Sequence, residues 1–528
     1  MATDTVQLPA GGSFLSTPPP RIFTVEDFGP DDRLMIDTAE QFVRKEIMAP
    51  DVLVRLERQE EGLMPRLIYD AGQLGLVGID TPEAYGGLGL PKNLAARILE
   101  FLSLNGSFSV TVGVTSGIAQ VGLSMFGTHE QKSAYLPRLA SGEWIGAYCL
   151  SEPNSGSDAL SATTRAERRG GLWVLNGTKM WISNAKWARF FLVMAKIDGE
   201  HFSAFLVERD FPGLIVAREE HKMGLKGSST ARVVLENCEV PLENLLYEPG
   251  KGHHVAFNAL NIGRFKLASM SMGPARDAIG LAVRYAQDRR QFGQPIAQFG
   301  LIRKKLVEMA ARFFVAESAI YRTGHLIDGA FDLWGGDVAG NRRAAEEYAI
   351  ECSAVKILST EVESFIVDEA LQVYGGYGFT EEFPIAQHYR DARVSRIYEG
   401  TNEINRVFLA SRLLKKIDDG ALPPESAGDS FVSELVARGV AARPAGQIEV
   451  GALSDLVTLA YAEQSARLRA SRVGGPTEAL YAAALPWINL QAAAAYQTLT
   501  GESVSLPAAP RTDWDGLADL VLHRQAPL

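Results

Sequence analysis

Apolar positions in the first part of the chain, residues 31–144, recur at the spacing of helices. Examples of these apolar positions are Leu34, Ile36, Phe42, Val43 and Ile47. This recurrence at intervals of three and four residues is typical of amphipathic helices, and few clusters of β-branched residues interrupt it. We therefore predict a helical region at the start of the chain.

The pattern changes near residue 145, where short runs rich in Val, Phe, Trp and Thr alternate with turn signals such as Gly-Gly and Asp-Gly. Residues 172–175, which precede Asn176-Gly177, and residues 190–193 and 202–207 are predicted as successive antiparallel strands. A small barrel or sandwich suits them. Long helical periodicity returns after residue 250 and continues to about residue 416, which indicates a bundle of long helices.

The predicted fold class is mainly α with a central β domain. After residue 416, two further helix-like stretches lie near residues 452–473 and 477–499, and no internal repeat of fixed period is found. The start of the chain is rich in proline and has no regular pattern. The predicted parts are a flexible arm (1–28), an N-terminal helical domain (29–144), a β domain (145–250), a helical bundle (251–415) and a C-terminal helical extension (416–528).

Composition is that of a globular protein with several folded units. The chain has 528 residues, of which 46% are hydrophobic and 22% are charged. A net charge of −11 argues against a protein that coats nucleic acid. The three cysteines form no CxxC pair and the eight histidines are scattered, which argues against a disulfide framework and against a metal site. No signal or transit peptide is readable in the first 22 residues, so we expect a reducing, cytoplasmic location.

Two uncharged stretches, residues 101–128 and 479–501, are long enough to resemble membrane spans. The first contains many small or polar residues, including Asn105 and Ser107, and the second contains Pro486 and Asn489. Because unpaired polar groups are costly in lipid, we predict that both are buried core helices and that the chain has no transmembrane segment.

Common cofactor and hydrolase signatures are absent. The chain contains no GxGxxG, GxxxxGK[ST], HExxH or GxSxG sequence, so a dinucleotide-binding Rossmann fold, a nucleotide hydrolase, a zincin and a serine hydrolase lose their usual support. The loop 147–158 is rich in hydroxyl groups and could donate hydrogen bonds to an anion or a flavin edge, or be a plain Ser/Asn turn. Trp181 and Ser183 share a strand face, where a core tryptophan is the alternative interpretation.

These segments stand in order with four others, at 288–293, 372–376, 390–393 and 397–402. Together they resemble the acyl-CoA dehydrogenase family over about residues 30–415, and the C-terminal region is similar to the very-long-chain branch. The resemblance implies a helical domain, a β-barrel-like domain and a four-helix bundle. It also implies one FAD per subunit and a homo-oligomer, for which we favour a dimer.

The resemblance assigns the catalytic base to Glu399. Removal of two hydrogens between Cα and Cβ of an acyl thioester needs a base for the α proton and a hydride acceptor. Burial beside an apolar substrate is expected to raise the pKa of Glu399. A favourable charge at a helix N-terminus is the alternative role. One family branch carries its base just before an arginine on another helix, and here Gly263 precedes Arg264, so no competing base is present.

The resemblance also implies the binding residues. Several of them, including Arg289 and Gln372, are expected to reach the FAD of a neighbouring subunit, and Glu403 is an acid where some members carry an amide. The implied FAD-contacting residues are Tyr148, Leu150, Ser151, Ser157, Trp181, Ser183, Arg289, Phe292, Gln372, Gly375, Gly376, Thr401 and Glu403. The implied substrate-contacting residues are Ser157, Arg264, Tyr398, Gly400 and Gly113.

The implied activity is oxidation of a fatty acyl-CoA to the trans-2-enoyl-CoA, with electrons passing to an electron-transfer flavoprotein. Gly113 and Ser109 are small where medium-chain relatives close the acyl cavity, so we expect medium to long chains. An oxidase that uses oxygen remains an alternative. A non-enzymatic assembly partner or a nucleic-acid-binding flavoprotein of the same fold is a second one, although the net charge and the presence of Glu399 count against both.

Overall fold

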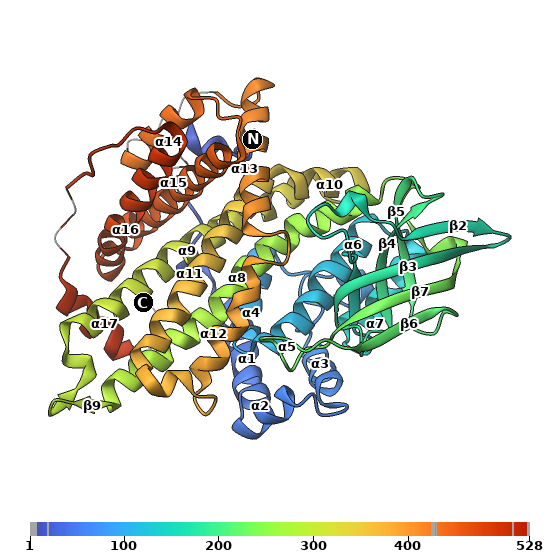
Figure 1. The fold of residues 1–528 in the computed structure, drawn as a ribbon, viewed down its shortest axis with the longest axis horizontal. Helices are drawn as coiled ribbons and strands as arrows, with labels where there is room; N and C mark the ends of the chain where they lie inside the picture. Colours follow the sequence, from blue (N-terminus) through green and yellow to red (C-terminus); the bar gives the residue numbers. More distant parts are fainter. Residues whose placement is uncertain are drawn as a thin grey trace. The chain divides into compact units, whose positions relative to one another are not determined.

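The structure is a computed structural model that describes residues 8–17, 19, 21–423, 428, 430–508, 510 and 512–524. It divides into two compact units, and the helices and strands that they contain are labelled in Figure 1. Unit 1 comprises Met1–Phe28, Leu267–Leu333 and Glu347–Leu528, and unit 2 comprises Gly29–Lys266 and Trp334–Glu346.

Unit 2 begins with helices, as the periodicity predicts. They are α1 (Pro30–Phe42), α2 (Pro50–Glu57), α3 (Leu63–Gln73), α4 (Lys92–Leu102), α5 (Gly106–Val112), α6 (Gln120–Phe126) and α7 (His129–Ala140). Local capping sets some boundaries: the Asn105 side chain accepts a hydrogen bond from the Phe108 N–H, and Thr128 forms a capping box with Gln131.

The predicted helix at 101–128 begins later than expected, because a turn separates α4 from α5. Its middle, Gly113–Ala119, is π-helical, and such segments are frequent at functional sites. Gly106–Phe126 is long and apolar enough to cross a membrane by length and composition, but 83% of its most apolar window is buried inside the protein. The burial is that of a core helix.

The β region of unit 2 is an eight-stranded sheet with the order β6-β7-β3-β2-β4-β5-β8, to which β1 is added by pairing with β4. One predicted boundary needs correction: the strand does not end at residue 175, because β3 continues through Asn176-Gly177 with a bulge against β7. The strands are β1 (Gly146–Cys149), β2 (Arg165–Arg169), β3 (Leu172–Ser183), β4 (Phe190–Ile197), β5 (His201–Glu208), β6 (Leu214–Glu219), β7 (Thr230–Pro241) and β8 (Leu245–Leu246).

Long helices dominate unit 1. They include the part of α8 (Gly252–Asp288) from Leu267 onward, α9 (Gly300–Trp334), α11 (Ala349–Tyr374), α12 (Pro384–Ala392) and α13 (Asn402–Asp418). The short hairpin β9 (Arg290–Gln291) and β10 (Gln294–Pro295) joins α8 to α9, and α10 (Val338–Glu347) lies almost wholly in unit 2.

The C-terminal extension belongs to the same compact unit as the bundle helices. Its two predicted helices are present as α15 (Gln447–Val473) and α16 (Pro476–Thr500), and sequence reasoning missed α14 (Phe431–Ala441) and α17 (Trp514–Arg524). Helix α15 packs against both α11 and α13, and Figure 1 shows these helices side by side.

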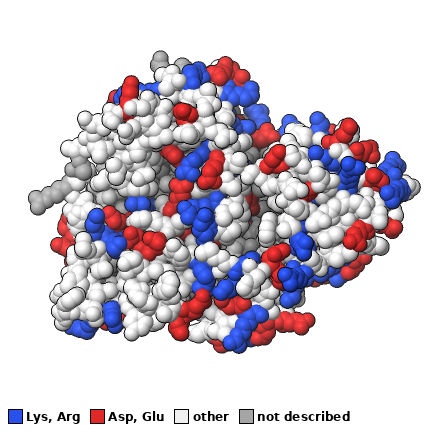
Figure 2. Space-filling view, in the orientation of Figure 1, with Lys and Arg blue, Asp and Glu red and all other residues white. Residues whose placement is uncertain are grey.

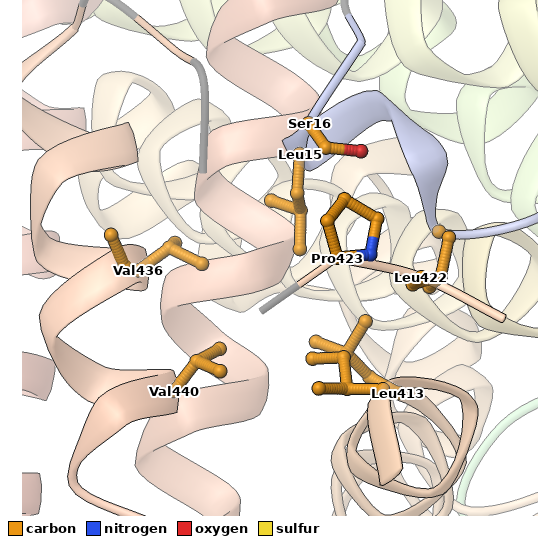
Figure 3. Close-up of a pocket in the computed structure, with 10 residues that line it drawn as sticks. Leu15, Ser16, Leu413, Leu422, Pro423, Val436 and Val440 are labelled. Carbon is orange, nitrogen blue, oxygen red and sulfur yellow. The ribbon is translucent and has the colours of Figure 1, made fainter. Parts of the chain in front are cut away.

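The flexible arm predicted for residues 1–28 is wrong for its described part. Phe14, Leu15 and Ile22 are buried, and the Phe14 ring packs against that of Tyr461. Figure 3 shows Leu15 beside side chains of α13 and α14, around a cavity of only about 10 Å³, which is barely enough for one water molecule. The arm is held by packing with distant helices, which its own local pattern does not record.

Candidate active site

The turn that carries Glu399 lies directly before α13. Glu399 has a φ of 57° and Gly400 a φ of 81°, so two successive residues adopt left-handed conformations. That conformation is uncommon for glutamate and must be held by its surroundings. Thr401 then caps α13, because its hydroxyl accepts a hydrogen bond from the Ile404 N–H at 3.3 Å. Helix initiation therefore fixes one side of the turn.

A buried lysine holds the other side. Lys356 on α11 is fully buried, and its Nζ donates to the Gly400 carbonyl at 2.9 Å and to Asn402 Oδ1 at 2.6 Å. The Asn405 amide donates to the same carbonyl at 2.8 Å. Two donors on the carbonyl that follows Glu399 keep the backbone of the turn in one orientation. Sequence reasoning missed Lys356, because nothing in its local pattern marks it.

Acidic side chains gather around Tyr398. Burial and the neighbouring carboxyl groups of Glu363, Glu399 and Asp391 raise the pKa of the Tyr398 hydroxyl above its ordinary value. Burial also raises the pKa of Glu363 to about 8, so this carboxyl group is mainly neutral at pH 7. Glu399 therefore stands beside a tyrosine that keeps its proton. Glu363 is a second functional candidate that sequence reasoning missed.

The hydroxyl-rich loop of unit 2 is attached to β3. The Met180 N–H donates to the Ser151 carbonyl at 2.9 Å, and Lys179 Nζ donates to Glu152 Oε1 at 2.7 Å and to the Leu150 carbonyl at 3.1 Å. Both Lys179 and Glu152 are buried. The structure thus brings the loop 147–158 together with the strand segment 179–183, as the sequence predicts for a shared ligand surface.

Trp181 is the most prominent side chain of this surface. Its φ is 60°, at an irregularity in the pairing of β3 with β7, and its side chain is 61% exposed, whereas the next residue, Ile182, is buried. The alternative interpretation of Trp181 as a core tryptophan is wrong. An exposed indole beside the partly exposed hydroxyls of Ser151 and Ser183 suits a flat polar ring such as a flavin.

The other predicted cofactor residues lie in unit 1 and are largely exposed. Phe292, at the tip of the hairpin between α8 and α9, is 94% exposed with a φ of 51°, and the Arg289 guanidinium lies 5.4 Å from the centre of the Tyr377 ring. A Cβ added to Gly375 or Gly376 would meet nothing within 4 Å. The open backbone at these glycines and the Arg289 guanidinium are groups that can bind a phosphate-bearing ligand. Gln372 and Glu403 are exposed, and Thr401 is the helix cap already described.

The substrate-contacting residues predicted in unit 2 lie in three separate places. Gly113 starts the π-helical segment, Arg264 is buried with its guanidinium on Asn261 Oδ1 at 3.1 Å, and Ser157 is exposed in the loop. A buried ion pair also braces the π-helical segment: Lys266 Nζ donates to the Ser116 carbonyl at 3.1 Å and to Asp80. Within the described residues, no group of three or more His, Cys, Asp or Glu side chains could hold a metal ion.

Comparisons with known proteins agree on one family. The family descriptions that match are "Acyl-CoA dehydrogenase, N-terminal domain" over residues 29–143, "middle domain" over 147–238 and "C-terminal domain" over 250–414. These matches leave the N-terminal arm and the C-terminal extension outside.

Relatives and a solved structure extend the match. The chain is 45% identical over 444 residues to a "Probable acyl-CoA dehydrogenase" of Bacillus subtilis, covering 83% of this chain and 74% of that protein. It is 36% identical to the human mitochondrial short-chain specific acyl-CoA dehydrogenase, covering 72% and 90%. An acyl-CoA dehydrogenase complexed with FAD from Bacillus anthracis superposes with a TM-score of 0.90 at 38% identity, covering 98% of this chain and 100% of that one. The extension is therefore shared with a solved structure.

Proposed function

The chain belongs to the acyl-CoA dehydrogenase family, and we propose that it oxidises a fatty acyl-CoA to the trans-2-enoyl-CoA with FAD as cofactor. The observation that carries this proposal is the turn at Glu399, a carboxylate held in a left-handed conformation by Thr401 on one side and Lys356 on the other. A general base needs a fixed position more than it needs a particular secondary structure.

The proposed chemistry begins with the α proton. Glu399 removes it, while the backbone N–H of Glu399 donates to the thioester carbonyl and stabilises the negative charge that develops there. FAD, when bound, supplies the hydride acceptor for the Cβ hydrogen. Tyr398 keeps its proton, because burial and nearby carboxyl groups raise its pKa, and so it adds no charge beside the base.

We propose that the flavin lies on the exposed face of Trp181, with the hydroxyls of Ser151 and Ser183 beside it and Tyr148, Leu150 and Ser157 around it. Arg289, together with the open backbone at Gly375, is assigned to phosphate groups of the FAD bound by a neighbouring subunit. The relative from Bacillus anthracis was solved in complex with FAD, which supports FAD as the cofactor. The remaining cofactor residues proposed are Phe292, Gln372, Gly376, Thr401 and Glu403.

Electrons are proposed to pass to an electron-transfer flavoprotein, and the active form is proposed to be a homodimer. Phe292, which is 94% exposed, is proposed to contact the FAD of the second subunit. An oxidase remains the alternative for the second half-reaction and differs in how fast oxygen reoxidises the reduced flavin.

A nucleic-acid-binding role has less support, because Figure 2 shows acidic and basic side chains interspersed over the face drawn.

Acyl chains of medium to long length are proposed as substrates. Gly113 has no side chain and begins the π-helical segment, and Ser109 hydrogen-bonds to Ser103 at 2.8 Å rather than extending a bulky group. Each methylene of a longer chain that enters a preformed apolar slot gains up to about 0.8 kcal/mol. The gain favours long substrates where the wall residues are small. Arg264 and Gly400 are proposed as supporting substrate contacts.

The decisive experiment is Glu399→Gln in the FAD-loaded enzyme. An amide cannot take the α proton, so flavin reduction by a long-chain acyl-CoA under anaerobic conditions is expected to slow by roughly a hundred- to ten-thousandfold. Binding of acyl-CoA and of FAD should persist. The matched control is Glu382→Gln, because Glu382 is an exposed acid in the loop before α12. The flavin of this variant should be reduced at the native rate. Native-rate reduction in Glu399→Gln would remove Glu399 as the base.

A further inference from the structure

An arginine joins the C-terminal extension to the bundle. Arg406 on α13 donates through Nε to Asp455 Oδ1 at 2.7 Å and through Nη2 to Glu361 Oε1 at 2.8 Å. Asp455 lies on α15 of the extension, and Glu361 lies on α11 of the bundle. One guanidinium therefore contacts two carboxylates that come from different parts of the chain.

The same contacts continue to the turn before α13. Glu361 Oε1 also accepts a hydrogen bond from Asn402 Nδ2 at 3.1 Å. Asn402 Oδ1 accepts one from Lys356 Nζ, which in turn donates to the Gly400 carbonyl next to Glu399. A continuous series of hydrogen bonds thus links the extension to the turn. Asn402 is its central member, since its amide donates to the acid and accepts from the lysine.

We propose that Asp455 is a positioning residue that acts through Arg406 on the turn carrying Glu399. The extension would then contribute to the geometry of the reaction as well as to the fold. The inference rests on the proposed role of Glu399 as the base, and it goes beyond it by assigning a function to a helix outside the region that the family descriptions match.

Charge balance explains why the loss of Asp455 would be felt at the turn. Two cations, Lys356 and Arg406, alternate with two anions, Glu361 and Asp455, along the series. Without Asp455, Arg406 would be drawn entirely to Glu361, and Glu361 would have less capacity to orient the Asn402 amide. The asparagine would then hold Lys356, and with it the Gly400 carbonyl, less firmly.

The ion pairs that Arg406 forms with Glu361 and Asp455 are also within reach of solvent ions. Arg406, Glu361 and Asp455 line a cavity of about 690 Å³ between α11, α13, α15 and α16, and the Asp455 side chain is 36% exposed. Ion pairs at such positions are weakened by salt. The rate of flavin reduction should therefore vary with ionic strength in the native enzyme. It should vary less in the Asp455→Asn variant, in which this side chain is neutral.

The test uses Asp455→Asn in the full-length, FAD-loaded enzyme, with rates expressed per bound flavin. The limiting rate of flavin reduction by a long-chain acyl-CoA is expected to fall roughly three- to tenfold, with little change in the substrate concentration at half-saturation. Asp455→Glu should recover most of the rate. Glu449→Gln, which removes a negative charge from the same helix, should leave the rate native.

A second variant separates positioning from mere attachment of the extension. If the series acts as a unit, Glu361→Gln and Asp455→Asn together should slow reduction less than the product of their separate effects. A variant that loses thermal stability but reduces flavin at the native rate and with native salt dependence would overturn the inference. Glu399→Gln in the same assay tells the two proposals apart: if it is inactive while Asp455→Asn is native, only the positioning role fails.

Discussion

The buried ion pair between Glu152 and Lys179 gives a prediction about the flavin loop that does not depend on catalysis. Lys179 has no exposed surface, and Glu152 accepts further hydrogen bonds from the Thr163 N–H at 2.6 Å, the Thr163 hydroxyl at 2.8 Å and the Thr164 N–H at 3.0 Å. Lys179→Met keeps much of the volume and removes the counter-charge. A buried carboxylate would be left with neutral donors alone.

The size of the expected loss of stability follows from the pKa of the Glu152 carboxyl group. Although burial disfavours its charged form, the Lys179 ammonium and the hydrogen bonds hold the pKa of Glu152 at about 2, against an ordinary value of 4.5. A pKa lowered by about 2.5 corresponds to about 3 kcal/mol of stability. Burial lowers the pKa of the Lys179 ammonium, so part of this gain is offset on the lysine side. We expect Lys179→Met to lower the free energy of unfolding by about 2–3 kcal/mol near neutral pH.

The assay is denaturant unfolding of the FAD-loaded enzyme, monitored by the rise in flavin fluorescence when FAD is released. The matched control is Arg169→Met, since Arg169 pairs with Glu167 at 2.8 Å on β2 with both side chains about half exposed. That pair should contribute at most about 1 kcal/mol. Because the folded pKa of Glu152 is depressed, the native stability contribution is present above about pH 4.5 and is lost as pH falls towards 2. Equal stability of the two methionine variants at pH 7 would refute the reasoning.

Two other residues give shorter predictions. Burial raises the pKa of Glu363 to about 8, so the folded state keeps a proton that the unfolded chain loses above about pH 4.5, and the free energy of unfolding should fall between these pH values by up to about 5 kcal/mol. Glu363→Gln should reduce this fall, measured as the difference between the denaturation midpoints at pH 5 and pH 8.5. An unchanged difference would count against the assignment. Gly113→Glu should shift catalytic efficiency, measured from C4 to C18 acyl-CoA, towards short chains, and an unaltered profile would show that Gly113 does not line the acyl cavity.

Sequence patterns predicted well where the determining information is local. Helical periodicity and short apolar runs gave the order of helices, sheet and helices, and the spaced motifs led to the family that the comparisons support. The strand that contains Trp181 was also predicted, because strand alternation is read directly from neighbouring residues. Its left-handed backbone was not, since tryptophan gives no local signal for a positive φ.

The features that sequence reasoning missed are fixed by residues far apart in the chain. Lys356 reaches the Gly400 carbonyl across 44 positions, and Arg406 reaches Asp455 across 49. At the arm, the Gly12 N–H donates at 2.6 Å to Glu351, 339 positions away. None of these contacts leaves a periodic trace, because each joins polar groups that are far apart in the sequence. The left-handed Glu399 turn is stabilised by such contacts, so its motif can be recognised in the sequence while the forces that hold it become apparent only in the fold.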